Sequence, residues 1–159
     1  MALSCNTWLS TRFCQPRFIF PFDHPVELNI FVDSSLLAYA ACTYINGRLF
    51  FAKAKVGPLK QRTIPELELM AMSLGVDLGE FFCETLTRSE ITIVYWSDSQ
   101  VCLSWLESSK PLKPFVRNRV NKINATCASF KYVPSALNPA DCATRGITST
   151  IDSLLWWNG

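Results

Sequence analysis

The sequence predicts an α/β fold, and three observations lead to this prediction. A strand hairpin is centred on the Asn-Gly pair at 46–47, an amphipathic helix begins near Thr63, and a strongly apolar strand at 91–96 passes directly into a helix. With 159 residues, of which 49% are hydrophobic and 18% charged, the chain is long and apolar enough to bury one substantial core.

The remaining composition narrows the class of protein. Seven cysteines are scattered without a CxxC pair, so zinc and a disulfide framework are both poorly supported, and an intracellular, reducing environment is expected. We see no signal peptide, and no apolar run approaches the roughly 20 residues of a membrane span. The net charge of +2 is too small to indicate a nucleic-acid partner by itself.

The first strands form an antiparallel group. Leu28–Val32 is a short strand that ends at Asp33, and Ala38–Ile45 and Arg48–Lys55 are the two arms of the hairpin. The Asn-Gly pair between the arms is the pair that best tolerates the positive φ angles of a type I′ turn.

A helix follows, from about Thr63 to Phe82. Thr63 and Glu66 form a capping box at its start, and Glu68 lies in its first turn. Glycines at 75 and 79 lie on the Glu68 side, which predicts a face that approaches the sheet closely. The predicted apolar stripe of this helix consists of Leu67, Met70, Leu74, Leu78 and Phe81.

The strand Ile91–Trp96 is apolar on both faces, as expected of a central strand. Asp98 follows it directly, where the chain turns into the next helix. In an open α/β sheet this is the carboxyl edge, where ligands bind. The alternative is that Asp98 only caps the helix.

The last part of the chain contains a basic helix, a strand and a final helix. The basic helix is expected at about 113–125 and the strand at 130–133, followed by a loop at 134–137. In the final helix Asn138 is the predicted cap, Pro139 the first residue, and Asp141 a first-turn acid. Asp141 could instead serve only to favour the helix dipole.

Basic side chains are candidates for contacts with a nucleic-acid backbone, and the alternative is a solvated amphipathic face. These residues are Lys60, Arg62, Lys110, Lys113, Arg117, Arg119 and Lys122.

Four acids stand at element boundaries: Asp33, Glu68, Asp98 and Asp141. Strand ends and helix starts can converge on one edge of a sheet, and four carboxylates gathered there would repel one another unless cations lay between them. All-oxygen ligands suit Mg²⁺ or Mn²⁺, and a pair of such ions supports in-line phosphoryl displacement.

Around these acids the sequence resembles the ribonuclease H domain of BEL/Pao-type LTR retrotransposons. The resemblance rests on Val-Asp-Ser-Ser at 32–35, Pro-x-Leu-Glu-Leu at 65–69, Tyr-Trp-Ser-Asp-Ser at 95–99 and Asn-Pro-Ala-Asp-x-Ala-x-Arg-Gly at 138–146. It implies a ribonuclease H-like fold, with a five-stranded mixed sheet (three antiparallel strands, then two parallel) flanked by helices.

The resemblance also implies a function. The expected reaction is cleavage of the RNA strand of RNA/DNA hybrids with two Mg²⁺ ions, for which Mn²⁺ could substitute. By motif position the metal-binding acids are Asp33, Glu68, Asp98 and Asp141, whereas Glu66 keeps its capping role.

The resemblance also suggests the organisation of the chain. The predicted divisions are an N-terminal arm at 1–25, a ribonuclease H-like domain at 26–146 and a C-terminal tail at 147–159, which packs back or continues a longer chain. Reverse transcriptase and integrase regions of a polyprotein are possible partners, in the cytoplasm or in virus-like particles.

One departure from the family pattern leaves alternatives open. Many ribonucleases H carry a histidine in the loop before the last helix, but this loop has none, and the only histidine is His24. The alternatives are a catalytically inactive remnant that binds nucleic acid or a protein, and an integrase-like strand-transfer domain.

Overall fold

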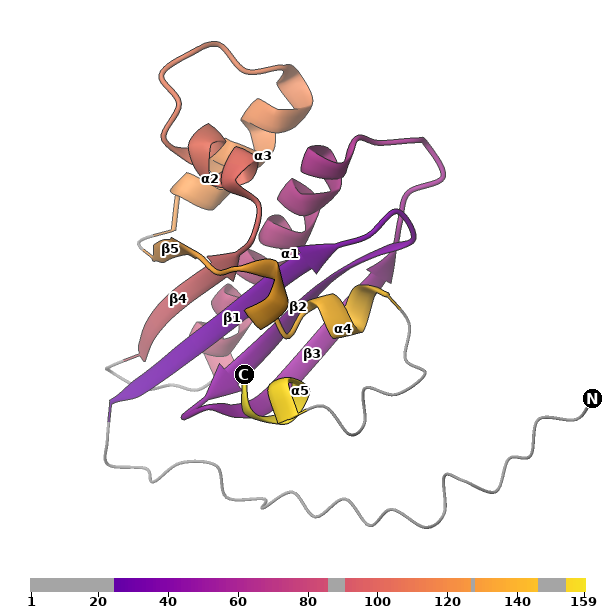
Figure 1. Cartoon of the computed structure of the whole chain (residues 1–159). Coiled ribbons are helices and arrows are strands. Elements are labelled where there is room, and N and C mark those ends of the chain that lie inside the picture. The colour runs from indigo at the N-terminus through magenta and orange to yellow at the C-terminus, as the bar shows by residue number, and fades with distance from the viewer. Residues whose placement is uncertain (1–24, 86–90, 127, 146–153) are drawn as a thin grey trace, which may run out of the picture.

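The computed structural model describes residues 25–85, 91–126, 128–145 and 154–159. Almost all of the predicted arm and the first part of the predicted tail lie outside these ranges. The described elements form one five-stranded sheet in the order β3-β2-β1-β4-β5, with helices on both faces (Figure 1). The strands are β1 (Val26–Ser34), β2 (Ala38–Ile45), β3 (Arg48–Val56), β4 (Ile91–Ser97) and β5 (Ser129–Tyr132).

The predicted mixed sheet is confirmed. Strands β1, β2 and β3 pair antiparallel, whereas β4 pairs parallel with both β1 and β5. At the β2–β3 turn, Asn46 and Gly47 have φ angles of 52° and 69°, which is the positive-φ pair that a type I′ turn requires. Strand β1 extends two residues beyond the predicted strand at each end, because its pairing continues to Val26 against β4 and to Ser34 against β2.

Helix α1 (Ile64–Thr85) covers one face of the sheet and is packed closely against it. A Cβ built at Gly75 would lie 2.7 Å from Val32 Cγ1, and one at Gly79 would run into the Tyr95 ring and hydroxyl. The predicted close approach at the two glycines is therefore confirmed. The predicted stripe is wrong at Phe81, which is 52% exposed, because the neighbouring Phe82 turns inward and is only 5% exposed.

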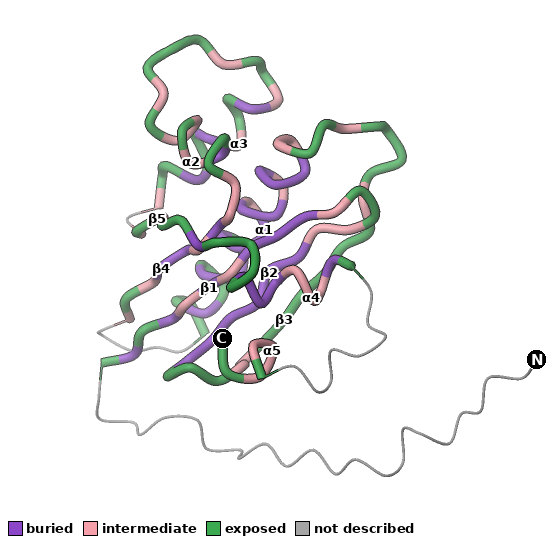
Figure 2. The backbone as a smooth tube through the Cα atoms, in the orientation of Figure 1, coloured by how far each residue is buried: buried purple, intermediate pink, exposed green. Residues whose placement is uncertain are grey.

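Helices α2 (Gln100–Leu106) and α3 (Pro114–Asn124) lie beyond the carboxyl end of β4 and beside α1 (Figure 1). The apolar side of α3 consists of Val116, Val120 and Ile123, which are buried in the main core together with α1. The opposite side of α3 is exposed (Figure 2). The predicted amphipathic basic helix is therefore present, within one residue of its expected bounds.

The final segment differs from the prediction at its start. A short 3₁₀ turn, η2 (Ser135–Leu137), precedes α4, which comprises only Asp141–Thr144. Asn138 does not cap this helix: its buried amide nitrogen donates to the Val32 carbonyl at 2.9 Å, and its Oδ1 accepts from the Ala140 amide. Asn138 therefore fastens the segment before α4 to the end of β1.

Helix α5 (Leu154–Asn158) packs on the sheet face opposite α1. The Tyr44 hydroxyl donates to the Trp156 carbonyl at 2.8 Å, and the Trp156 side chain packs on a small cluster around Cys42 and Tyr44. The described end of the tail thus packs back on the domain. Within the described ranges, none of the helices combines the length and hydropathy that a membrane crossing requires.

Candidate active site

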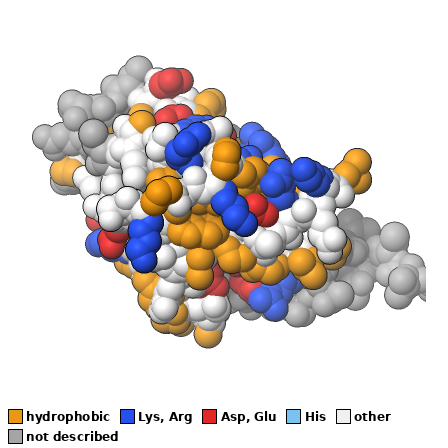
Figure 3. Space-filling view, turned by 90° about the horizontal axis from the view of Figure 1, so that it is seen from above, with side chains coloured by type: hydrophobic (Ala, Val, Ile, Leu, Met, Phe, Trp, Pro, Cys, Tyr) orange, Lys and Arg blue, Asp and Glu red, His pale blue; other side chains and the backbone are white. Residues whose placement is uncertain are grey.

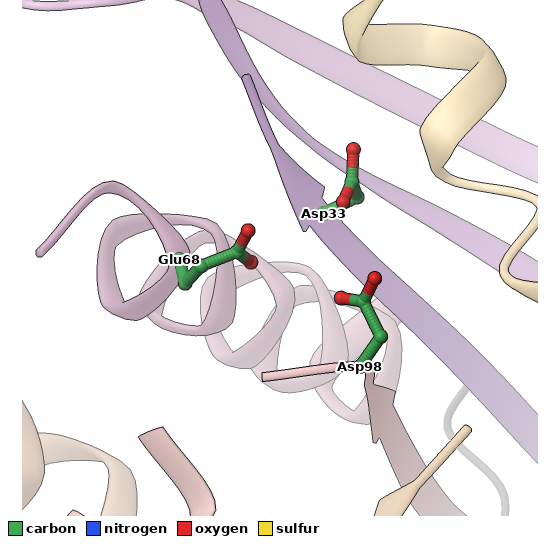
Figure 4. Close-up of side chains that lie close together, drawn as sticks. All are labelled: Asp33, Glu68 and Asp98. Carbon is green, nitrogen blue, oxygen red and sulfur yellow. The ribbon is translucent and has the colours of Figure 1, made fainter. Parts of the chain in front are cut away.

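Three carboxylates from three separate elements meet at one edge of the sheet (Figure 4). Asp33 lies near the end of β1, Asp98 follows β4, and Glu68 lies in the second turn of α1 rather than in the predicted first turn, because the helix already begins at Ile64. One oxygen of each lies within 4.8 Å of those of the other two. The parallel register explains the first two positions, because Val32 pairs with Ser97 and an acid follows directly on both strands.

Burial sets the electrostatics of this acid cluster of Asp33, Glu68 and Asp98. Asp33 is 3% exposed and Glu68 is 7% exposed. The pKa of Asp33 is raised to about 6: desolvation by burial is the largest cause, the hydrogen bond from Thr144 opposes it, and the charges of Asp98 and Asp141 add to the rise. Desolvation, followed by the charge of Asp33, raises the pKa of Glu68 to about 8.

Two hydroxyls hold two of the acids. The Thr144 hydroxyl donates to Asp33 Oδ2, and the Ser135 hydroxyl donates to Asp98 Oδ2 at 2.5 Å. By contrast, Glu68 Oε2 and Asp98 Oδ1 are buried without a hydrogen-bond partner among the described residues. Unpartnered buried carboxylate oxygens are costly unless a cation compensates them. The donor set, all oxygen and gathered at one point, therefore fits a divalent cation.

Asp141 lies beside this cluster but is not part of it. Its side chain is 33% exposed, and its Oδ1 lies 2.5 Å from Arg145 Nε, one turn further along the chain. Its charge nevertheless raises the pKa of Asp33, so Asp141 contributes to the electrostatics of the cluster. The structure thus brings together three of the four predicted acids and places the fourth next to them, paired with an arginine.

Asp98 and Glu66 differ in whether they cap a helix. Asp98 is not the cap of α2, because Ser99 takes this position and its hydroxyl accepts from the Cys102 amide at 3.3 Å. Glu66 does take the predicted capping role, since its carboxylate accepts from the Thr63 amide at 3.1 Å.

The predicted basic residues fall into two groups. The first is engaged within the domain: the Arg62 and Arg119 guanidinium groups lie 4.0 Å and 3.6 Å from the centre of the Phe115 ring, and Lys122 pairs with Asp77. The second group is exposed and consists of Lys60, Lys110, Lys113 and Arg117. Seen from above, basic side chains lie among hydrophobic ones, and several gather side by side (Figure 3).

Sequence reasoning missed the side chains that support the acids. Thr144 and Arg145 lie within the string Asn-Pro-Ala-Asp-x-Ala-x-Arg-Gly, but no spacing rule assigns them partners. Ser135 lies in the loop at 134–137, and its sequence surroundings do not indicate Asp98 as a partner. Their roles depend on the folded path of residues 135–145 across the carboxyl end of the sheet.

Comparison with known proteins agrees with this fold. The model of the Pao retrotransposon-like RNaseH-like domain matches residues 2–99, and the chain therefore belongs to this family. The match includes Asp33, Glu68 and Asp98, and it ends before Asp141. No curated protein matches the chain.

Solved structures with the same fold are ribonuclease H domains. The LC11 ribonuclease H1 in complex with an RNA/DNA hybrid has a TM-score of 0.55 at 12% identity, over 73% of this chain and 91% of that one. The N-terminal ribonuclease H domain of Rv2228c from Mycobacterium tuberculosis has a TM-score of 0.52 at 15% identity, over 71% and 86%. Ribonuclease H1 from Halobacterium salinarum has a TM-score of 0.51 at 16% identity, over 74% and 91%.

A viral enzyme also shares the fold. The foamy viral protease-reverse transcriptase has a TM-score of 0.50 at 13% identity, with 68% of this chain matched. The match spans only 21% of that viral chain. The protein described here therefore has a ribonuclease H-like fold and belongs to a retrotransposon family.

Proposed function

We propose that this protein is an endoribonuclease that hydrolyses the RNA strand of RNA/DNA hybrids. The observation that supports this proposal best is the acid cluster, in which Asp33, Glu68 and Asp98 converge within 4.8 Å from three elements. Such convergence has no structural benefit in itself, because like charges held together at a buried edge destabilise the fold.

Divalent cations are the groups that these residues would hold. Asp33, Glu68 and Asp98 would bind one ion, and Asp141 would join Asp33 in binding a second. We propose Mg²⁺, with Mn²⁺ as a substitute, because hard oxygen ligands favour these ions. When bound, such ions stabilise the attacking and leaving oxygens of a phosphodiester displacement.

The protein's own groups prepare this site. Thr144 and Ser135 fix one oxygen each of Asp33 and Asp98, which leaves Asp98 Oδ1 directed to the cluster. Asn138 ties residues 138–140 to the end of β1, so that Asp141 is delivered next to Asp33. These contacts keep the carboxylates in place before any substrate arrives, which lowers the cost of ordering them during the reaction.

The substrate class follows from the family and from the exposed basic residues. Lys60, Lys110, Lys113 and Arg117 are exposed, and positive side chains of this kind bind phosphates. Arg62 and Arg119 hold the basic helix α3 to the start of α1 through Phe115. We propose that these exposed basic residues bind the backbone of the hybrid, while the acid cluster lies at the phosphodiester that is cleaved.

The larger context of the chain is also a proposal. Because the family is that of Pao retrotransposons, we propose that residues 26–146 act beside reverse transcriptase and integrase regions of a polyprotein. Reverse transcription would then generate the hybrids, in the cytoplasm or in virus-like particles.

Cleavage of a labelled RNA/DNA hybrid by the purified chain tests the function. We expect cutting of the hybrid in Mg²⁺ or Mn²⁺, no cutting of single-stranded RNA, and loss of activity in EDTA and in Asp98→Asn. If a chain shown to be folded by circular dichroism cut nothing in either metal, the proposal would be wrong. An inactive remnant that retains binding would then be the better description, and hybrid binding would be measured next.

A further inference from the structure

The four acids are not equally available to cations, and the difference lies in their present partners. Glu68 Oε2 and Asp98 Oδ1 have no partner among the described residues, so a cation entering between Asp33, Glu68 and Asp98 displaces no hydrogen bond from these two atoms. Asp141 Oδ1, in contrast, is already bound to the Arg145 guanidinium at 2.5 Å. A cation that uses this oxygen must first displace an arginine.

We infer that Arg145 is an internal competitor for the second cation: it occupies Asp141 until a metal ion takes its place. This inference rests on the proposed function. It makes the two cation positions unequal, with a first position open in the metal-free protein and a second position, between Asp33 and Asp141, closed by the arginine.

The local structure suits such an exchange. Helix α4 is a single turn, and Arg145 follows it with a side chain that is 70% exposed. Removing the guanidinium from Asp141 therefore breaks little packing and returns the positive charge to water. The negative charges of Asp141, Asp33 and Asp98 all raise the pKa of Arg145.

The effect of Arg145 on the affinity for the second cation is expected to be small. An exposed ion pair contributes little, and its loss changes a binding constant by about two- to fivefold. Arg145 therefore lowers the affinity for the second cation without preventing its binding.

Mn²⁺ titration of the full chain, followed by electron paramagnetic resonance of the free ion, tests the inference without relying on catalysis. We expect Arg145→Gln to tighten the weaker Mn²⁺ position about two- to fivefold and to leave the tighter position unchanged. Arg145→Lys, which keeps the charge, should lie between the two proteins. The matched control is Arg48→Gln, at the far end of the sheet, which should change neither affinity.

The Mg²⁺ concentration that half-activates hybrid cleavage gives a second measurement, and it should fall in Arg145→Gln by the same factor. If the wild type binds two ions and cuts the hybrid, but Arg145→Gln changes neither the weaker affinity nor the Mg²⁺ midpoint, the inference is overturned while the proposed function stands. If the wild type binds no Mn²⁺, both fail.

Discussion

The Thr144 hydroxyl donates a hydrogen bond to the buried Asp33 carboxylate across 111 positions of sequence. Asp33 lies near the end of the first strand and Thr144 at the end of α4, so this bond joins the two ends of the described domain at the acid cluster. The Ser35 hydroxyl reinforces the junction by donating to the Thr144 carbonyl at 2.9 Å.

Thr144→Val should therefore weaken both the fold and the site. Valine has nearly the same shape but cannot donate, so one buried Asp33 oxygen loses its partner at a cost of about 1–3 kcal/mol in the free energy of unfolding. Urea denaturation in EDTA measures this loss. Thr144→Ser keeps the hydroxyl and should retain most of the stability. Equal stability of the valine variant and the wild type would show that the bond contributes nothing.

The raised pKa values predict an unusual dependence of stability on pH in the metal-free protein. The pKa of Glu68 rises from 4.5 in the unfolded chain to about 8, and that of Asp33 rises from 3.8 to about 6. Between these limits the folded state binds more protons than the unfolded state. The free energy of unfolding should therefore fall as the pH rises from about 4 to about 8.

Urea midpoints at pH 5 and pH 8, with and without Mg²⁺, check this dependence. In EDTA the protein should be less stable at pH 8 by on the order of a few kcal/mol, because one pKa unit corresponds to about 1.4 kcal/mol. Mg²⁺ should restore stability at pH 8, because it binds the ionised carboxylates. Glu68→Gln should flatten the EDTA profile, and an unchanged profile in that variant would assign the effect to other groups.

Much of the fold and three of the acids could be predicted from the sequence because short-range patterns determine them. The Asn46-Gly47 pair specifies its turn, and the strands that end at Asp33 and Asp98 are apolar enough to be central. Once two such strands are parallel neighbours, their carboxyl ends meet, and the acids that follow them must lie close together. The capping box then places Glu68 near the start of the helix.

The supporting contacts could not be predicted, because they depend on where one segment crosses another. Asparagine is a residue type that commonly caps helices, yet the side-chain amide of Asn138 donates to the backbone carbonyl of Val32 in β1. Helix α4 begins at Asp141, two residues later than the proline at 139 predicts, and the pairing of Arg145 with Asp141 is seen only in the folded structure. A single sequence contains no signal for the tertiary contact that decides between such choices.

Helix α1 packs so closely on β1 that we expect only glycine to fit at position 75. Alanine would gain about 1 kcal/mol in helix propensity. However, its Cβ would lie 2.7 Å from Val32 Cγ1, directly before Asp33. We expect Gly75→Ala to destabilise the protein by a net of about 1–2 kcal/mol, because overpacking costs more than the propensity gain. Thermal and urea unfolding measure the change.

The control for this prediction is on the same helix. Glu80 is exposed, so Glu80→Ala gains propensity without any clash with the sheet and should leave stability nearly unchanged. If Gly75→Ala were as stable as Glu80→Ala, helix α1 would have to sit further from the sheet than the structure shows.

The exposed side of α3 predicts how the protein binds a hybrid. Lys113 and Arg117 are exposed and make no ion pair within the described ranges, so both charges are available to phosphates. Reversing both to glutamate should weaken hybrid binding and lower the slope of log affinity against log salt by about 2, close to one for each lost phosphate contact. Fluorescence anisotropy in an Asp98→Asn background, in which cleavage is expected to be lost, measures both quantities.

The charge-matched control reverses Arg48 and Lys53, which are exposed on the edge strand β3. An equal effect of the two double reversals would indicate general charge repulsion, whereas a loss confined to Lys113 and Arg117 would identify α3 as the surface that contacts the backbone.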